Sequence, residues 1–248
     1  MTTIAILLRG LPPDAVGGME TQTDQMATHL SDRGHEVCVN TKAGSGDAPD
    51  RPYDVLRLPH LRWHPMLSDL TFLIAAVVVL VRHHARFDVL QCMMLYPMGA
   101  VGTVVHRLTG LPYLAWVRGG DYYLMRDVRW KRWLMRRVLT DTLVLVQAEA
   151  IEEDLRADFA DCAMDLAVVG NGVTIPPNRA TGGAGVLYLG RLAPKKAVGD
   201  LIRAAAVADV PLTIVGDGPE RDRLEALADT AGVDATFVGA VAPAAVDR

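Results

Sequence analysis

Short runs of apolar residues alternate with longer segments of mixed polarity along most of the 248-residue chain. In the N-terminal part, the apolar runs predict strands at 3–9, 36–40, 54–59, 87–92, 112–117, 142–147 and 166–170. The intervening segments predict helices at 19–33, 70–81, 97–108, 130–139 and 149–159. Continuous apolar strands separated by helices are typical of a parallel sheet covered on both faces. The pattern therefore predicts a doubly wound α/β lobe over residues 1–170.

The alternation is interrupted by a segment rich in Pro and Gly. Residues 171–185 read NGVTIPPNRATGGAG, which has no periodicity and is expected to be an interdomain linker. The pattern then resumes, with strands expected at 186–190, 212–216 and 235–239 and helices at 198–208 and 219–231. The sequence thus predicts two Rossmann-like lobes. The second, residues 186–248, is expected to be incomplete because it has only three strands.

Composition sets broad limits on function. Half of the residues are hydrophobic, 22% are charged and the net charge is −4, as in an ordinary soluble domain without nucleic-acid partners. The scattered cysteines, Cys38, Cys92 and Cys162, are expected to be reduced, buried thiols of a cytoplasmic protein. The N-terminal run is interrupted by Arg9 and lacks a basic leader, so no secretory signal is expected.

Two segments raise the question of a membrane. The apolar run 70–81 is well short of the roughly 20 residues that span a bilayer, so a buried core helix is expected. The run 126–137 is basic and contains Trp130 and Trp133. It could lie on an anionic membrane surface, but a solvated helix with both tryptophans in the core is the favoured interpretation.

The first candidate ligand site lies between the first strand and the first helix. Gly17 and Gly18, followed by Met19 and Glu20, would let the backbone approach a ligand, and the free amides of a helix N-terminus favour an anion. The spacing differs from the dinucleotide fingerprint G-x-G-x-x-G. A flexible loop with a glycine at the helix start explains the residues equally well.

The second candidate follows the first strand of the second lobe. Arg191 and Lys196, in the segment GRLAPKK, would lie at the carboxyl end of a parallel strand, where α/β folds bind ligands. A guanidinium that binds in a bidentate manner and an ammonium point charge suit a diphosphate. Spacing alone also fits a solvated charge cluster before a helix.

Two further strand-to-helix turns could line a site. Gly216, Asp217 and Gly218 precede Pro219, which is expected at the first helical position. These residues fit either an ordinary strand-to-helix turn or a loop that lines a ligand site.

The fourth candidate, Arg118-Gly119-Gly120-Asp121, follows the strand at 112–117. It places a cation and a carboxylate at the carboxyl end of this strand. Arg118 and Asp121 are candidate catalytic residues, and a buried salt bridge between them is the alternative.

Several enzyme classes lack their motifs. The sequence contains no H-E-x-x-H, no Walker loop and no G-x-S-x-G, and its seven histidines show no metal-ligand spacing. No cofactor is therefore expected. A dehydrogenase is disfavoured without the dinucleotide fingerprint, and an epimerase without a recognisable acid–base set.

Taken in order, these segments resemble the family 4 retaining glycosyltransferases of the GT-B fold. GGMETQTDQMATHLSDRGHEV is similar to the family's first glycine loop, helix and second strand, and VVGNGV to the N-G-V that precedes its second lobe. VLYLGRLAPKKAVGDLI is similar to its G-R-L-x-P-x-K-G segment, and LTIVGDGPERDRLEALADTAGVDATFVGAV to the strand, helix and strand that follow. The resemblance spans nearly the whole chain.

The resemblance implies a reaction and its participants. Residues 1–170 would be the acceptor-side lobe, and 186–248 the start of the nucleotide-sugar-binding lobe. The Gly18 amide would bind the donor diphosphate across the interlobe cleft. Arg191 and Lys196 would neutralise the diphosphate as it leaves, so that no metal is needed. The sugar would pass with retention to a lipid-linked or glycan acceptor, with the enzyme in the cytoplasm or at the inner face of the membrane.

Three departures from the family pattern matter. Arg118 stands where the family often has histidine, and arginine cannot act as a base at neutral pH. Ala197 stands where the family usually has glycine. The family's later Glu-x7-Glu segment is absent, so a truncated or inactive nucleotide-sugar-binding homologue is the alternative hypothesis.

Overall fold

The computed structural model describes residues 1–15, 17–44, 50–172, 175, 185–241 of the chain, and these divide into two compact units, Met1–Gly172 and Val173–Arg248. Most of the expected linker 171–185 lies outside the described residues. Each unit has its own parallel sheet and hydrophobic core, and each is described by itself.

The first unit is a doubly wound α/β lobe. Its strands are β1 (Thr3–Leu7), β2 (Glu36–Lys42), β3 (Asp54–Leu58), β4 (Val89–Cys92), β5 (Tyr113–Val117), β6 (Leu143–Val146) and β7 (Asp165–Val168). They pair in parallel in the order β3-β2-β1-β4-β5-β6-β7. The order reverses between β1 and β4, and the crevice at such a switch point is where open α/β sheets bind ligands.

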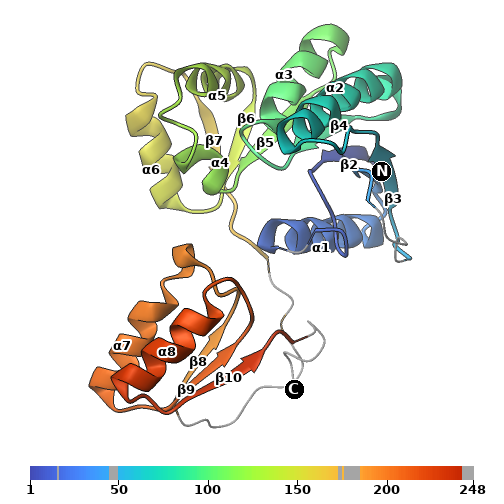
Figure 1. Ribbon diagram of the computed structural model, residues 1–248. Helices are drawn as coiled ribbons and strands as arrows, with labels where there is room; N and C mark the ends of the chain where they lie inside the picture. Colours follow the sequence, from blue (N-terminus) through green and yellow to red (C-terminus); the bar gives the residue numbers. More distant parts are fainter. Residues whose placement is uncertain (16, 45–49, 173–174, 176–184, 242–248) are drawn as a thin grey trace. The chain divides into compact units, whose positions relative to one another are not determined.

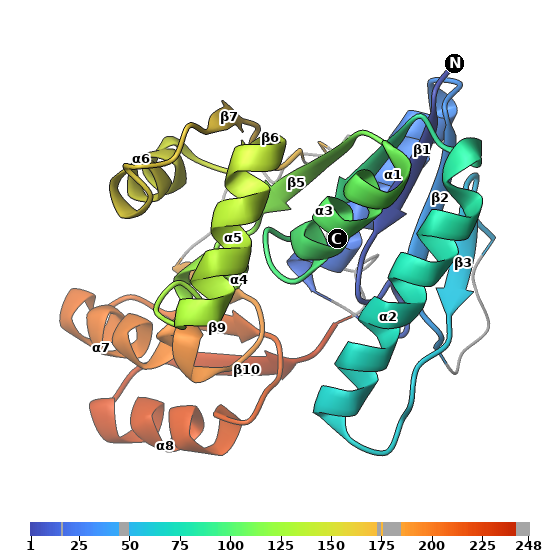
Figure 2. The ribbon, with the colours of Figure 1, turned by 90° about the horizontal axis from the view of Figure 1, so that it is seen from above.

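Helices cover both faces of this sheet (Figure 1). They are α1 (Gly18–Asp32), α2 (Pro65–His83), α3 (Met98–Thr109), α4 (Gly120–Tyr123), α5 (Arg129–Asp141) and α6 (Glu149–Asp158), with a short 3₁₀ turn, η1 (His84–Arg86). Helix α1 packs through Ala27 on one face, against Ile4, Ile6 and Val39. Helices α2, α3 and α5 pack on the other face (Figure 2). The prediction of a doubly wound lobe is confirmed.

The second unit has a three-stranded parallel sheet in the order β10-β9-β8. Its elements are β8 (Val186–Leu189), η2 (Pro194–Lys196), α7 (Val198–Ala208), β9 (Leu212–Val215), α8 (Arg221–Ala231) and β10 (Ala235–Gly239). Helices α7 and α8 pack on one face, around Ile202, Ile214 and Leu224. On the other face Leu187, Leu189 and Val238 are exposed. Among the described residues, helices therefore cover only one face of this smaller sheet.

Two sequence-based expectations about apolar helices are wrong. Helix α2 is longer than the apolar run suggested, and only one side of it is buried: Phe72, Ala76 and Leu80 face the core, whereas Ile74 and Val78 are exposed. The helix packs on a sheet instead of inside a bundle, so half of its surface has no partner in the unit.

The tryptophans of α5 were also misplaced by the sequence analysis. The core side of α5 is made by Met135, Val138 and Leu139, so Trp130 and Trp133 are 57% and 54% exposed. Helix α8 differs in a smaller way, because it begins at Arg221 and Pro219 lies before it instead of at its first position.

Candidate functional site

In the second unit, backbone hydrogen bonds join the two loops that the sequence singled out. The loop after β8 and the loop after β9 are tied at Leu192, whose N–H donates to the Asp217 carbonyl at 2.9 Å. The Glu220 N–H donates back to the Leu192 carbonyl at 3.3 Å. Residues 190–192 and 216–218, separate in sequence, thus form one edge at the carboxyl ends of adjacent parallel strands.

Two glycines make this close approach possible. A Cβ atom on Gly216 would lie 1.9 Å from the Gly190 carbonyl oxygen, and one on Gly218 would lie 2.2 Å from the Leu192 carbonyl oxygen. Gly216 also has a φ of +143°, which side chains rarely adopt. The glycines of the GDGP turn are therefore required by the packing of one loop against the other.

The cations at this edge have no protein partner among the described residues. Arg191 and Lys196 are exposed, and neither side chain forms a hydrogen bond or an ion pair within the part of the chain that the structure covers. By contrast, Arg221 and Arg223 nearby are paired with Glu225 and Glu220 at 2.8 and 2.6 Å. Two cations without a partner among the described residues, close to the N-termini of α7 and α8, suit an anionic ligand.

Ala197 ends the 3₁₀ turn that carries Lys196 and caps α7. Its φ of +52° and ψ of +34° are left-handed. This conformation explains why glycine suits the position: for an L-residue other than glycine it costs about 1–2 kcal/mol. The chain keeps the loop geometry at the cost of local strain.

In the first unit, Gly17 and Gly18 form the start of α1. Gly17 is the extended N-cap, with a φ of −167°, and no side chain caps the helix. A Cβ atom on Gly18 would have no atom within 4 Å, whereas one on Gly17 would lie 2.5 Å from a carboxylate oxygen of Glu20. Open space beside Gly18 leaves the first amides of α1 accessible, while Glu20 folds back over the helix start.

Arg118 follows β5, and its side chain contacts helix α1. Its guanidinium lies 4.8 Å from the Trp116 ring and also donates to the Gln22 side chain of α1. The Nε and Nη1 atoms are buried and have no hydrogen-bond partner. Burial lowers the pKa of Arg118, against the opposing fields of Asp121 and Glu20. The site therefore holds a partly desolvated cation with unused donors.

Asp121 forms no salt bridge with Arg118, so that alternative is wrong. Its carboxylate is 3% exposed and accepts the backbone N–H of Leu95 at 2.5 Å and that of Arg118 at 2.8 Å. Desolvation raises the pKa of Asp121 to about 6, although the backbone donors lower it. The carboxylate ties the loop after β4 to the turn after β5 and thereby positions Arg118.

The structure also contains a cavity that the sequence analysis missed. It has a volume of about 800 Å³ and lies at the carboxyl ends of β1 to β4, around the switch point of the sheet. Its polar lining comes from side chains on separate segments: Arg9, Asp14, Glu20, Lys42, His60 and Arg62. The only signal in the sequence was the position of Arg9 and Lys42 at strand ends, which is too common to identify a site.

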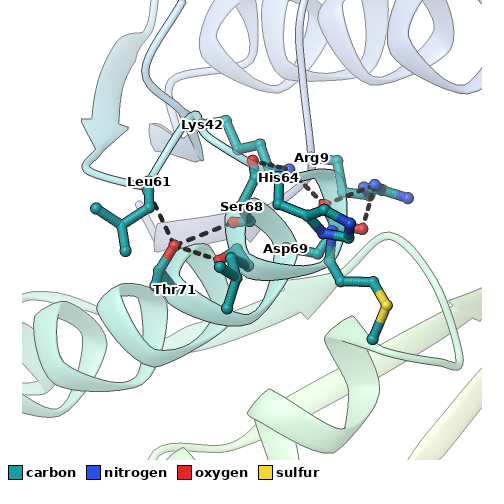
Figure 3. A network of polar contacts seen from close by, with 9 residues as sticks. Arg9, Lys42, Leu61, His64, Ser68, Asp69 and Thr71 are labelled. Atoms are coloured by element: carbon teal, nitrogen blue, oxygen red, sulfur yellow. Dashed lines mark hydrogen bonds and ion pairs between the residues drawn. The ribbon is translucent and has the colours of Figure 1, made fainter.

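Asp69 of α2 organises two of these cations (Figure 3). Its carboxylate pairs with Arg9 at 2.5 Å and also with Lys42, whose ammonium donates to Ser68 at 3.1 Å. The two cations lower the pKa of Asp69, although burial opposes this. Because Arg9 follows β1 and Lys42 ends β2, Asp69 fastens the first turns of α2 to the rim of the cavity.

Arg62 differs from the other cations of the cavity. Its guanidinium donates, among the described residues, to the carbonyls of Ala43 and Gly44 at 3.3 and 3.5 Å. Within the described ranges no carboxylate neutralises it. Among the described residues, the cavity thus offers a cation without a counter-ion beside two cations that share Asp69.

Comparison with known proteins identifies the family of the chain. The model of Glycosyltransferase Family 4 matches residues 16–175, and that of glycosyl transferases group 1 matches residues 176–248. No curated protein sequence matches the chain.

Solved structures share the fold at low sequence identity. WaaG, a glycosyltransferase involved in lipopolysaccharide biosynthesis, is 17% identical with a TM-score of 0.68, over 98% of this chain and 71% of its own. HepE from Anabaena, in complex with UDP-glucose, is 16% identical with a TM-score of 0.69, over 98% and 70%. TarM from S. aureus is 11% identical with a TM-score of 0.71, over 97% and 78%.

These neighbours are GT-B glycosyltransferases. The first family model alone covers more than half of the sequence. The chain therefore belongs to Glycosyltransferase Family 4 and has the α/β architecture of the GT-B fold.

Proposed function

We propose that the protein transfers a sugar from a nucleotide-diphosphate-sugar donor to an acceptor hydroxyl, with retention and without a metal ion. The proposal rests mainly on the two hydrogen-bonded loops of the second unit. There, Arg191 and Lys196 have no protein partner among the described residues. A diphosphate would supply the missing anion, and the cations would stabilise the charge that develops as the nucleotide leaves. The complex of HepE with UDP-glucose supports a nucleotide sugar as the donor.

In this proposal the first unit receives the acceptor. The cavity at the switch point of its sheet is large enough for a sugar and has charged groups on several sides. Arg62, which has no carboxylate partner among the described residues, would bind an anionic group of the acceptor, as in a lipid-linked or phosphorylated glycan. The complex of TarM with UDP and a glycerol-linked sugar is a precedent for carbohydrate ligands on such a fold.

Arg118 and Asp121 have distinct proposed roles. Arginine stays protonated at neutral pH, so Arg118 would bind an oxygen of the substrate and would not abstract a proton. Asp121 would act as a positioning residue, since its carboxylate already accepts two backbone N–H groups. The Gly18 amide, at the open start of α1, would contact a substrate anion.

A transfer assay with anomeric analysis tests this function. The chain is incubated with UDP-glucose, UDP-galactose and UDP-N-acetylglucosamine together with glycolipid extracts, with and without a chelator. We expect a product whose anomeric configuration equals that of the donor, formed at the same rate with the chelator present. An inverted product, or activity abolished by chelation and restored by a divalent cation, would contradict the proposed mechanism.

The alternative is a nucleotide-sugar-binding homologue without turnover. Donor binding with neither transfer nor donor hydrolysis in the assay above would select it.

A further inference from the structure

A stripe of apolar side chains runs along the outer side of α2. Leu67, Leu70, Ile74 and Val78 recur at three- or four-residue spacing, and all are exposed. This spacing places them on one helix face, opposite Phe72, Ala76 and Leu80, which pack in the core. No charged side chain interrupts the stripe before Arg82. Isolated exposed apolar residues are ordinary, but a continuous stripe marks an interaction surface.

The neighbouring helices extend this stripe into a surface. Helix α3 contacts both α2 and α5, and the three helices lie side by side on the same face of the sheet (Figure 2). Val104 and Leu108 are exposed on α3, and Trp130 and Trp133 on α5. We call the exposed face formed by these four residues and the α2 stripe the outer helical face.

Positive charge is concentrated on the same three helices. They carry seven arginines and lysines and two aspartates, although the whole chain has a net charge of −4. Both aspartates are neutralised, Asp69 by Arg9 and Lys42 and Asp141 by Arg107. Basic side chains beside exposed tryptophans are the arrangement that suits an interface with anionic lipids.

The cations and the tryptophans of α5 are in direct contact. The Arg137 guanidinium lies 5.1 Å from the Trp133 ring, and the Lys131 ammonium lies 5.6 Å from the Trp130 ring. Trp130 also packs edge-on against Tyr96 at 5.7 Å between ring centres. Such pairs hold indole rings and positive charges at the same level, where lipid headgroups meet acyl chains.

Length and composition alone would let one helix among the described residues cross a membrane, the segment Pro65–Arg86. Its packing indicates a different arrangement. Phe72, Ala76 and Leu80 are fully covered by the protein core, so only one side of the helix could meet lipid. An orientation parallel to the surface needs no rearrangement of the unit and exposes the outer helical face to the bilayer.

We propose that the outer helical face binds the surface of a bilayer that contains anionic lipid. A second copy of the chain is the less suitable occupant, because two faces with the same excess of positive charge would repel each other. Helix α2 also reaches the cavity, since its Asp69 binds the cavity residues Arg9 and Lys42. A lipid-linked acceptor in the membrane would thus lie near the proposed acceptor cavity; binding to lipid itself does not depend on the proposed function.

Vesicle sedimentation tests the proposal directly. The protein is mixed with vesicles of phosphatidylcholine alone or with added phosphatidylglycerol. We expect binding to the anionic vesicles only, weakened by salt, with a blue shift of tryptophan fluorescence. Ile74→Asp and the double variant Trp130→Ala/Trp133→Ala should each weaken binding more than tenfold. Val207→Asp, a change at an exposed apolar residue of α7, is the matched control and should bind like the wild type.

A second pair of variants tests the charge. Arg129→Glu/Arg137→Glu should weaken binding by more than tenfold, since one basic residue near an anionic surface contributes roughly fivefold. Arg33→Glu, at an exposed arginine on the opposite side of the sheet, should not. Circular dichroism and thermal unfolding confirm that the variants fold. Equal vesicle binding by wild type and Ile74→Asp, no binding to anionic vesicles, or concentration-dependent dimers without lipid binding would overturn the proposal.

Discussion

The Arg118 guanidinium stacks on the Trp116 ring at 4.8 Å, at the carboxyl end of β5. The same guanidinium donates to Gln22 of α1, so one side chain links the strand to the helix that begins at Gly18. Stacking on an indole and donation through a planar fork are properties of arginine that lysine lacks. The contacts at this position therefore need a guanidinium and not merely a positive charge.

Replacement of Arg118 by lysine tests this adaptation. We expect Arg118→Lys to lower the free energy of unfolding of the first unit by about 1 kcal/mol, because the stack and the bond to Gln22 are lost. Sugar transfer should fall more than tenfold. Arg33→Lys, at an exposed arginine whose side chain has no hydrogen-bond or ion-pair partner among the described residues, is the control and should change neither quantity. An Arg118→Lys protein with wild-type stability and activity would refute the role assigned to the stack.

Asp121 predicts a pH dependence of stability. Its pKa is raised from 3.8 to about 6 in the folded protein. Between these values the folded state binds more protons than the unfolded state, so stability falls as the pH rises. A shift of that size corresponds to about 3 kcal/mol, contributed below pH 4 and lost above pH 6.

Chemical unfolding between pH 4 and pH 6.5 measures this effect. Asp121→Asn cannot titrate, so the stability of the variant relative to the wild type should increase with pH by about 2–3 kcal/mol. Glu153→Gln, at an exposed carboxylate of α6, is the control and should show no such trend. A difference between Asp121→Asn and wild type that is constant over this range would show that the carboxylate is not desolvated in the folded state.

Ala197 predicts a stabilising substitution. Because its φ is +52°, Ala197→Gly should relieve the strain and stabilise the α7 region by about 1 kcal/mol. Ala204→Gly, at an exposed position inside α7, should destabilise the same region by about 1 kcal/mol. Hydrogen exchange of the α7 and β8 amides reports both changes. If both substitutions changed the stability of the α7 region in the same direction, the left-handed conformation at Ala197 would be contradicted.

The order of elements could be predicted from the sequence because apolar periodicity is local information. The strand around 186–190 and the helix 198–208 are found where the pattern predicted them. The partners of each helix face are not local information. The side of α2 that carries Ile74 and the side of α5 that carries Trp133 remain exposed because the sheet covers only one side of each helix.

The candidate site shows the same division. The glycines at 216 and 218 were identifiable because their spacing reflects a backbone constraint. The contact of Asp121 with Leu95 joins residues 26 positions apart, and the pairing of Asp69 with Arg9 joins residues 60 positions apart. Such long-range contacts are produced by the fold and leave no motif in the sequence, so the cavity and its cations could not be predicted.

In the proposed function, Arg191 and Lys196 bind the diphosphate of the donor. Calorimetric titration of the chain with UDP measures this binding. Arg191→Ala and Lys196→Ala should each weaken UDP binding at least tenfold, because a charge-assisted hydrogen bond contributes about 1.5–3 kcal/mol. Lys195→Ala, the exposed neighbour in the same turn, should change it less than twofold. Absence of UDP binding by the wild type, or equal affinities for all three variants, would contradict the account.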